Sequence, residues 1–196
     1  MSDGPRLVLA SGSPRRVRIL ESLGVAFRWF ATDTDESLRS GESGAAAAER
    51  LARVKAEAGA ARDSLPVLAA DTVVLLEDRI YGKPESPADA ARILGELQGR
   101  RHDVVTGVCL WVEGRAHSGI ERTAVELLPM SEAERHWYVA TGEPLDKAGA
   151  YNVEGLGALF VAAIDGSPSN VAGLPVGLVR SLAREAGLDL GWTPRG

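Results

Sequence analysis

Apolar and polar residues alternate along the first third of the chain in runs that predict strands and helices in turn. Residues 7–10 are all apolar or small and predict a short buried strand, and residues 25–32 predict a second strand. Between them, apolar positions recur at roughly helical spacing over residues 15–23. The clearest helical pattern covers residues 43–62, where apolar positions follow the helical period and charged residues lie opposite.

The rest of the chain is richer in hairpins. A continuous apolar run over residues 66–76 predicts a buried strand, and residues 77–81 predict the tip and return of a hairpin. Further predicted elements are a helix over residues 86–99, a hairpin over 103–127, a helix opened by a capping box over 131–140, a strand over 158–164 and a helix over 176–186, with irregular stretches at 141–157 and 165–173. This order predicts an α/β fold, a mixed twisted sheet with flanking helices. We expect a single domain over residues 1–196 with two lobes around a central cleft.

Composition narrows the class of protein. The chain has 196 residues, 45% of them hydrophobic and 25% charged, which is ordinary for a globular protein. The net charge is −5 and no run of Lys and Arg exceeds two residues, so a nucleic-acid polymer is not an expected partner. The single cysteine, Cys109, excludes an internal disulfide, fits a reducing compartment and is interpreted as buried and inert. We expect no signal peptide in residues 1–6, no membrane span and a cytoplasmic location.

The turn after the first predicted strand carries the first candidate site. Ser13 is a good helix N-cap and Pro14 suits the first helical position. Arg15 and Arg16 then stand in the first turn, where the helix dipole repels cations. The conflict disappears if an anion binds there to free N–H groups, to the hydroxyl of Ser11 and to the guanidinium groups. The stretch therefore predicts a phosphate-binding turn, and the alternative is an ordinary strand-to-helix junction with two solvated arginines.

Asp71 is the second candidate, because a carboxylate inside an apolar strand is costly to bury without a partner. It needs a cation, a metal or several hydrogen-bond donors. Lys83, held between Gly82 and Pro84 across the predicted hairpin, is one possible partner. The alternative is a buried Asp–Lys pair with no catalytic role. Lys55, on the long predicted helix, is interpreted as part of a solvated face.

The acidic stretch around Glu36 offers hard oxygen ligands. Together with Asp33 and Asp35, Glu36 could share a divalent cation with Asp71, although acidic loops are commonly only solvated. The long polar stretch over residues 146–157 is a candidate binding loop, since long loops in compact domains are often functional. It has neither a Walker A sequence nor a dinucleotide fingerprint.

Taken together, the motifs resemble those of one known family along nearly the whole chain. They are Ala10-Ser-Gly-Ser-Pro-Arg-Arg16, Asp35-Glu36, Arg50-Leu-Ala-Arg-Val-Lys55, Ala70-Asp-Thr-Val-Val74, Gly82-Lys-Pro84, His102-Asp-Val-Val-Thr-Gly107, Tyr138, Asp146-Lys-Ala-Gly-Ala-Tyr151 and Gly155. In this order and spacing the sequence resembles the Maf family of nucleoside triphosphate pyrophosphatases, also described as septum-formation inhibitors. Each motif is modest alone, and the combination is specific.

The resemblance implies a homodimer that requires a divalent cation (Mg²⁺ or Mn²⁺). Members of the family cut a nucleoside triphosphate between the α- and β-phosphates, giving the monophosphate and pyrophosphate. The resemblance also implies a house-cleaning role, the removal of non-standard nucleotides. Carried over by motif, Asp71 resembles the proton acceptor that activates water, and Glu36 resembles a metal or water partner, so both are expected metal ligands. The expected catalytic residues are Asp71, Glu36 and Lys83, and the expected phosphate contacts are Ser11, Arg16, Lys55 and Lys83.

Three positions carry base selectivity in this family. The dTTP/UTP branch has Arg, Thr and Gln there, the 7-methyl-GTP branch has Trp, Gln and Glu, and this chain has Arg15, Thr72 and Glu154. A Gln amide both donates and accepts, as the O4 and N3–H edge of uracil requires, whereas an ionised Glu only accepts and suits a guanine-like edge. We expect dTTP/UTP as substrate. The alternatives are a 7-methyl-GTP-type preference, a nucleotide-binding regulator of division without significant turnover, and a sugar-nucleotide transferase.

Overall fold

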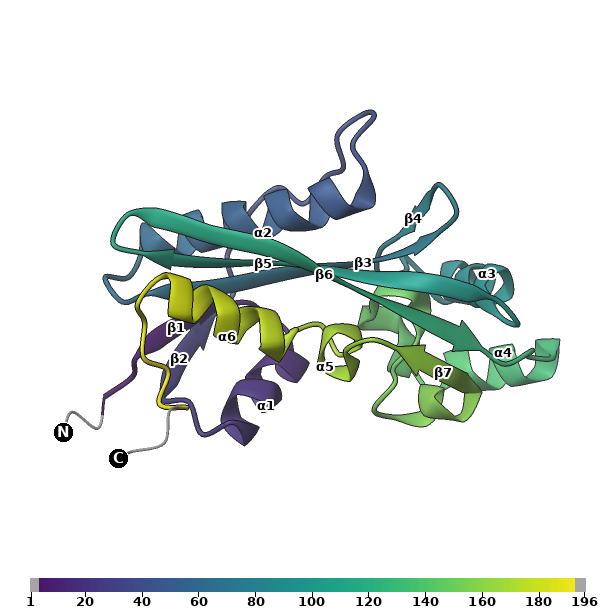
Figure 1. Ribbon diagram of the computed structural model, residues 1–196. Coiled ribbons are helices and arrows are strands. Elements are labelled where there is room, and N and C mark those ends of the chain that lie inside the picture. Colours follow the sequence, from purple (N-terminus) through teal and green to yellow (C-terminus); the bar gives the residue numbers. More distant parts are fainter. Residues whose placement is uncertain (1–3, 193–196) are drawn as a thin grey trace. The chain divides into compact units, whose positions relative to one another are not determined.

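The computed structural model describes residues 4–192 (Figure 1). It separates into two compact units, and three of the strands contribute residues to both. The first unit comprises residues 1–71, 106–121 and 173–196, and the second comprises residues 72–105 and 122–172. The segment on which the expectation about a signal peptide rests lies partly outside the described residues. Within the described chain, no helix combines the length and apolar character needed to cross a membrane.

Strands and helices alternate first and hairpins follow, as the hydrophobic pattern predicts. The elements are β1 (Leu7–Ala10), α1 (Pro14–Ser22), β2 (Phe27–Phe30), α2 (Gly44–Ala60), β3 (Val67–Leu76), β4 (Arg79–Tyr81), α3 (Pro87–Leu97), β5 (Arg101–Val112), β6 (Arg115–Leu127), α4 (Glu132–Ala140), three 3₁₀ turns η1 (Glu143–Asp146), η2 (Ala148–Ala150) and η3 (Leu156–Phe160), β7 (Val161–Asp165), α5 (Pro168–Val171) and α6 (Val176–Glu185). The strands described pair in the order β2-β1-β3-β5-β6-β7, with β4 on β3. β1 is parallel to β2 and β3, while β3–β4 and β6–β7 are antiparallel. The predicted mixed α/β sheet with flanking helices is confirmed.

In the first unit, helices cover both faces of the sheet at β1, which is why this strand is apolar throughout. Side chains of β1 alternate between two hydrophobic clusters. Leu7 and Leu9 pack in the cluster that includes residues of α1 and α6, whereas Val8 and Ala10 pack in the cluster that includes Ala residues of α2. β1 is therefore buried along its whole length, and the turn that follows it starts from a rigid strand.

The face of α2 that meets the sheet is made of small residues, so the helix lies unusually close to the strands. A Cβ on Gly107 of β5 would come within 2.3 Å of the backbone of Ala48 in α2. A Cβ on Gly59, near the end of α2, would lie 2.7 Å from the Val67 side chain. This close approach brings Lys55, on the same helix, down to the level of the strands.

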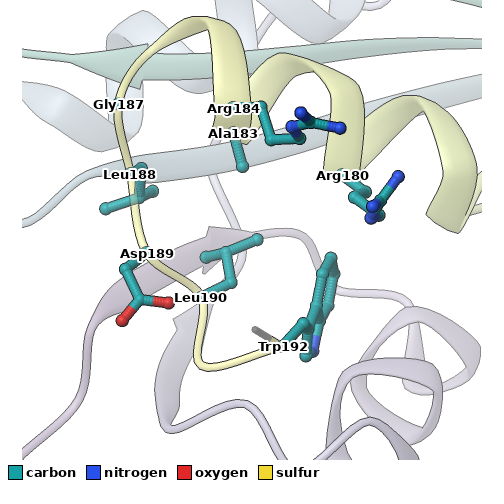
Figure 2. Close-up of a pocket in the computed structure, with 8 residues that line it drawn as sticks. All are labelled: Arg180, Ala183, Arg184, Gly187, Leu188, Asp189, Leu190 and Trp192. Carbon is teal, nitrogen blue, oxygen red and sulfur yellow. The ribbon is translucent and has the colours of Figure 1, made fainter. Parts of the chain in front are cut away.

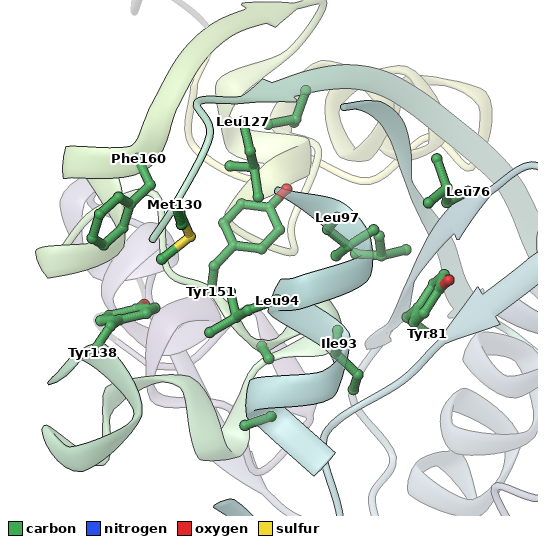
Figure 3. Packing of buried hydrophobic residues seen from close by; sticks show 14 of the residues in the cluster. Leu76, Tyr81, Ile93, Leu94, Leu97, Leu127, Met130, Tyr138, Tyr151 and Phe160 are labelled. Carbon is green, nitrogen blue, oxygen red and sulfur yellow. The ribbon is translucent and has the colours of Figure 1, made fainter. Parts of the chain in front are cut away.

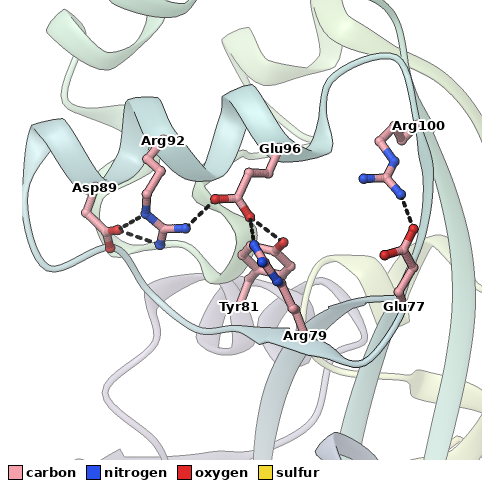
Figure 4. Close-up of polar contacts among 7 residues, drawn as sticks. All are labelled: Glu77, Arg79, Tyr81, Asp89, Arg92, Glu96 and Arg100. Atoms are coloured by element: carbon pink, nitrogen blue, oxygen red, sulfur yellow. Dashed lines mark hydrogen bonds and ion pairs between the residues drawn. The ribbon is translucent and has the colours of Figure 1, made fainter.

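The second unit has its own core, in which α3 and α4 pack with the 3₁₀ turns around Leu94, Leu97, Tyr138 and Tyr151 (Figure 3). Ser86 caps α3 through Asp89 N, and Ser131 opens α4 with the predicted capping box. On the outer side of α3, the carboxylate of Glu96 accepts hydrogen bonds from Tyr81 Oη at 2.6 Å and from Arg92 and Arg79 (Figure 4).

Two predicted boundaries are wrong. The strand predicted over residues 158–164 begins only at Val161, because residues 156–160 form the 3₁₀ turn η3. The stretch 165–173, predicted to be irregular, contains the short helix α5, which has Ser167 as N-cap and Pro168 at its first position. The expectation of a single domain with two lobes around a cleft stays a prediction, since the structure describes each unit by itself.

Candidate active site

The turn between β1 and α1 is organised by a buried hydroxyl. Ser11 is 6% exposed, and its Oγ accepts hydrogen bonds from Ser13 N and from Arg16 Nη1, both at 3.2 Å. Ser13 is the N-cap of α1 and Pro14 follows at the first helical position, as predicted, but the Ser13 side chain makes no capping bond. Ser11 therefore takes the place of a cap by satisfying the backbone N–H of Ser13.

Arg16 is fixed in this turn, in contrast to the alternative of a solvated arginine. Its Nε donates to the carbonyl oxygen of Gly173 at 2.7 Å, and its Nη1 donates to Ser11. Burial lowers the pKa of the Arg16 guanidinium to about 10, because lost hydration disfavours the cation, and the nearby Asp71 carboxylate offsets part of this pKa shift. Arg15 lowers the same pKa and Glu36 raises it, so charged groups from three segments act on Arg16. At neutral pH Arg16 remains a positioned cation.

Asp71 lies in β3 and pairs with Lys55 of α2. The distance from Lys55 Nζ to Asp71 Oδ1 is 2.6 Å, and the two side chains are 10% and 12% exposed. The interpretation of Lys55 as part of a solvated face is therefore wrong, because the small residues beside it let α2 lie close on the sheet. The partner that the structure records for Asp71 is Lys55 rather than the suggested Lys83.

Glu36 meets the same ammonium group. Its Oε1 lies 2.9 Å from Lys55 Nζ, and its side chain is about half exposed. Two carboxylates from distant segments thus face one cation position, here taken by Lys55. Mg²⁺ is typically held by one or two carboxylates together with substrate phosphates, so Asp71 and Glu36 are a donor set that fits such an ion. Among the described residues, no group of three or more His, Cys, Asp or Glu side chains could hold a metal by itself.

The loop that carries Glu36 is attached to α2 by an ion pair between Arg50 and Glu42, which sequence reasoning missed. Arg50 donates through Nε and Nη2 to the two carboxylate oxygens of Glu42, each at 2.6 Å, and Nη2 also donates to Ser37 O at 3.1 Å. Arg50 holds the pKa of Glu42 at about 2. Within the loop, Asp35 Oδ1 accepts a hydrogen bond from Ser37 N at 2.9 Å. Arg50 and Lys55 lie on the same helix and bind Glu42 and Glu36 respectively, so α2 provides both anchors of the loop.

The remaining predicted site residues, Thr72, Lys83 and Glu154, belong to the second unit. Thr72 follows Asp71 in β3 and is half-buried, Lys83 is exposed, and Gly82 O beside it accepts from Gly149 N at 3.1 Å. Glu154 is exposed, and its backbone N–H donates to Asn152 Oδ1 at 3.2 Å. The structure thus brings Ser11, Arg15, Arg16, Glu36, Lys55 and Asp71 together within the first unit.

Glu143 is a second residue that sequence reasoning missed. Its Oε1 accepts from Tyr138 Oη at 2.8 Å and from Gly157 N at 2.9 Å, and its Oε2 accepts from Leu156 N at 3.0 Å. A Cβ on Gly155 would lie 2.0 Å from Glu143 Oε2, so a larger residue there would push the Glu143 carboxylate aside. Glu143 therefore fixes the loop that contains Glu154.

His102 and Cys109, two side chains that could suggest other chemistry, are buried in the core. His102 Nε2 lies 2.8 Å from Tyr151 Oη, and burial lowers the pKa of His102 to about 4. Cys109 is buried in the core, as predicted, and burial raises the pKa of its thiol to about 12. Neither group supplies a nucleophile or a cation at neutral pH.

Nearly the whole chain is similar in sequence to known proteins. The chain is 47% identical over 196 residues to the dTTP/UTP pyrophosphatase of Anaeromyxobacter sp., covering 97% of this chain and 94% of that protein. It is 46% identical to the protein of the same name from Myxococcus xanthus, covering 97% of each chain. Among solved structures, a HAM1 protein from Coxiella burnetii matches 93% of this chain and 99% of its own at 15% identity, with a TM-score of 0.48. The family described as Maf-like protein matches residues 6–186. The chain belongs to this Maf-like family.

Proposed function

We propose that this protein is a nucleoside triphosphate pyrophosphatase that hydrolyses dTTP and UTP to the monophosphate and pyrophosphate. The observation that carries the proposal is the cluster in which Lys55 joins Asp71 and Glu36 while Arg16 lies near both carboxylates. Relatives 44–48% identical to this chain are named dTTP/UTP pyrophosphatase, which supports the choice of substrate.

The proposed proton acceptor is Asp71. Lys55 donates to its Oδ1, whereas its Oδ2 receives no hydrogen bond from the residues that the structure describes. Oδ2 is therefore available to accept a proton from the water that attacks the α-phosphorus, and Lys55 fixes the orientation of the carboxylate. Because phosphoryl chemistry depends mainly on positioning and charge neutralisation, Arg16 and the N–H groups after Ser11 would bind phosphate oxygens.

A divalent cation fits the same proposal. Asp71 and Glu36 would hold it, with Lys55 moving aside or sharing the carboxylate oxygens. When bound, such an ion neutralises charge on the phosphates and raises the acidity of water. We further propose, from the family resemblance, that the protein acts as a homodimer in the cytoplasm and that Lys83 contributes to catalysis.

Base selectivity is assigned to Arg15, Thr72 and Glu154 in this proposal. The Glu143 carboxylate keeps the loop of Glu154 in one conformation, which suits a residue that reads the edge of a base. An ionised Glu154 would contact uracil through a bridging water molecule, or would accept a hydrogen bond from the N3–H of uracil alone.

The test is turnover by the purified protein. We expect pyrophosphate release from dTTP and UTP with Mg²⁺, and weaker release from CTP and 7-methyl-GTP. Asp71→Asn should lower kcat by about 10²–10⁴, as for loss of a general base, while the protein stays folded by circular dichroism. Asp78→Asn, at an exposed hairpin tip, is the matched control and should retain full activity. Near-normal turnover of Asp71→Asn would remove Asp71 from this role, and tight nucleotide binding without pyrophosphate release would favour a regulator instead.

A further inference from the structure

A separate pocket lies where the chain folds back along α6. Gly187, with φ +68°, follows the end of the helix, and Leu188 N donates to Ala183 O at 2.8 Å, which reverses the chain direction. The segment that follows then runs beside α6 (Figure 2). Together they enclose about 440 Å³, a size within the range of roughly 300–1,000 Å³ for small-molecule sites.

The apolar wall of this pocket is held in place by hydrogen bonds, so the pocket is preformed. Trp192 Nε1 donates to Leu23 O at 3.2 Å, which fixes the indole ring. Asp189 accepts from Arg6 Nη1 at 2.9 Å through Oδ2 and from Gly191 N at 2.7 Å through Oδ1. Leu190, between these two anchors, is 4% exposed.

The opposite wall carries two guanidinium groups one helical turn apart. Arg180 and Arg184 both line the pocket, and the part of the chain that the structure describes offers neither of them a hydrogen bond or an ion pair. The nearby acids are bound elsewhere, since Glu185 lies 3.0 Å from His117 Nδ1 and Asp189 pairs with Arg6. Like charges at this spacing repel, and an anion between them would relieve the repulsion.

We propose that this pocket binds a small phosphorylated compound with a flat ring, of the class of a nucleoside monophosphate. Its phosphate would bind to Arg180 and Arg184, and its ring would pack against Trp192 and Leu190. Figure 2 shows the two arginines projecting from α6 and the indole ring on the returning segment. The proposed reaction uses none of these residues, so this binding site goes beyond the proposed function and does not depend on it.

The experiment follows the indole N–H resonance of Trp192 by ¹H–¹⁵N NMR of the full chain, assigned by its loss in Trp192→Phe. The probes are UMP, uridine and inorganic phosphate. We expect a saturable shift with UMP, and at least tenfold weaker binding of uridine and of phosphate, because each supplies only half of the contacts. Observing Trp192 separates this pocket from any binding of UMP at the active site.

The matched variants test the two guanidinium groups. Arg180→Gln combined with Arg184→Gln should weaken UMP binding at least tenfold without changing the fold, because both side chains are exposed. Arg115→Gln, an exposed arginine of the same unit, should leave the UMP affinity unchanged. The proposal is overturned by an indole resonance that does not move, by uridine binding as tightly as UMP, or by a UMP affinity that survives in the double variant. Turnover of triphosphates does not enter any of these outcomes.

Discussion

At the level of single residues, Lys55 is the cation that pairs with the Asp71 carboxylate inside the sheet. Both side chains are nearly buried, so removing the ammonium group would leave a buried carboxylate without its hydrogen-bonded cation. We predict that Lys55→Met lowers the free energy of unfolding by about 3 kcal/mol, measured by urea denaturation. The double variant with Asp71→Asn should be less destabilised than the sum of the two single variants, because the unpaired charge is then gone.

An exposed ion pair serves as the control for the loss of stability expected in Lys55→Met. Arg101 lies 2.5 Å from Asp165, with both side chains more than half exposed. Arg101→Met should cost less than about 1 kcal/mol, since solvent screens surface pairs. If Lys55→Met cost no more than Arg101→Met, Lys55 would not be the group that stabilises Asp71 in its strand.

His102 makes stability depend on pH. It is 3% exposed, and burial lowers its pKa to about 4 from an ordinary value of 6.5. Above pH 6.5 the imidazole is neutral in both the folded and unfolded chain. Between pH 6.5 and 4 the unfolded chain binds the extra proton, so the folded state loses up to about 3 kcal/mol as the pH falls through this window.

Urea unfolding at several pH values measures this loss. His102→Gln should flatten the dependence of the unfolding free energy between pH 6.5 and 4. His136→Gln, at an exposed position, should leave the dependence as in the wild type. An identical pH dependence in all three proteins would mean that folding does not lower the pKa of His102.

Among the elements, the loop before α2 depends on one ion pair. Arg50 binds both carboxylate oxygens of Glu42 and the carbonyl of Ser37, and thereby ties the loop of Glu36 to the helix. Arg39 lies inside this loop and is a site for trypsin. We predict that Glu42→Gln speeds cleavage after Arg39 by about tenfold, because the loop opens more often once the charge-assisted bonds are lost.

Fragment masses over a time course of limited proteolysis measure that rate. Glu57→Gln, an exposed position on α2, is the control and should be cleaved like the wild type. Equal cleavage of Glu42→Gln and wild type would show that the loop is held by other contacts.

Elements were predictable where local signals define them. Ser86 with Pro87 and the capping box at Ser131 fix helix starts through their own backbone, so these helices are where the sequence places them. The start of β7 was not predictable from the sequence. Residues 156–160 form a 3₁₀ turn, and its first N–H groups donate to Glu143, more than ten residues earlier. A partner at that distance leaves no local pattern.

Across the whole molecule, the residues of the candidate site also divide into those that local sequence signals predict and those that depend on distant partners. Ser11, Arg16 and Asp71 could be chosen from the sequence, since a dipole conflict and a carboxylate in an apolar run are local anomalies. The partner of Asp71 could not, because Lys55 reaches it only through the close packing of α2 on the sheet, and helical periodicity alone placed Lys55 in solvent. Long-range packing therefore determines which charges meet.

Gly107 is the residue on which that packing depends most directly. It lies in β5, and a Cβ there would come within 2.3 Å of the Ala48 carbonyl group in α2, where backbone cannot shift aside. We predict that Gly107→Ala lowers the free energy of unfolding by about 2 kcal/mol or more, as for overpacking in a rigid core, and also lowers turnover by displacing Lys55 from Asp71. Gly177→Ala, in α6 with open space around its Cα, should be neutral or stabilising by up to about 1 kcal/mol. Equal melting temperatures of the two variants would show that α2 can move away from β5 freely, and Lys55 would then owe its position to the Asp71 carboxylate alone.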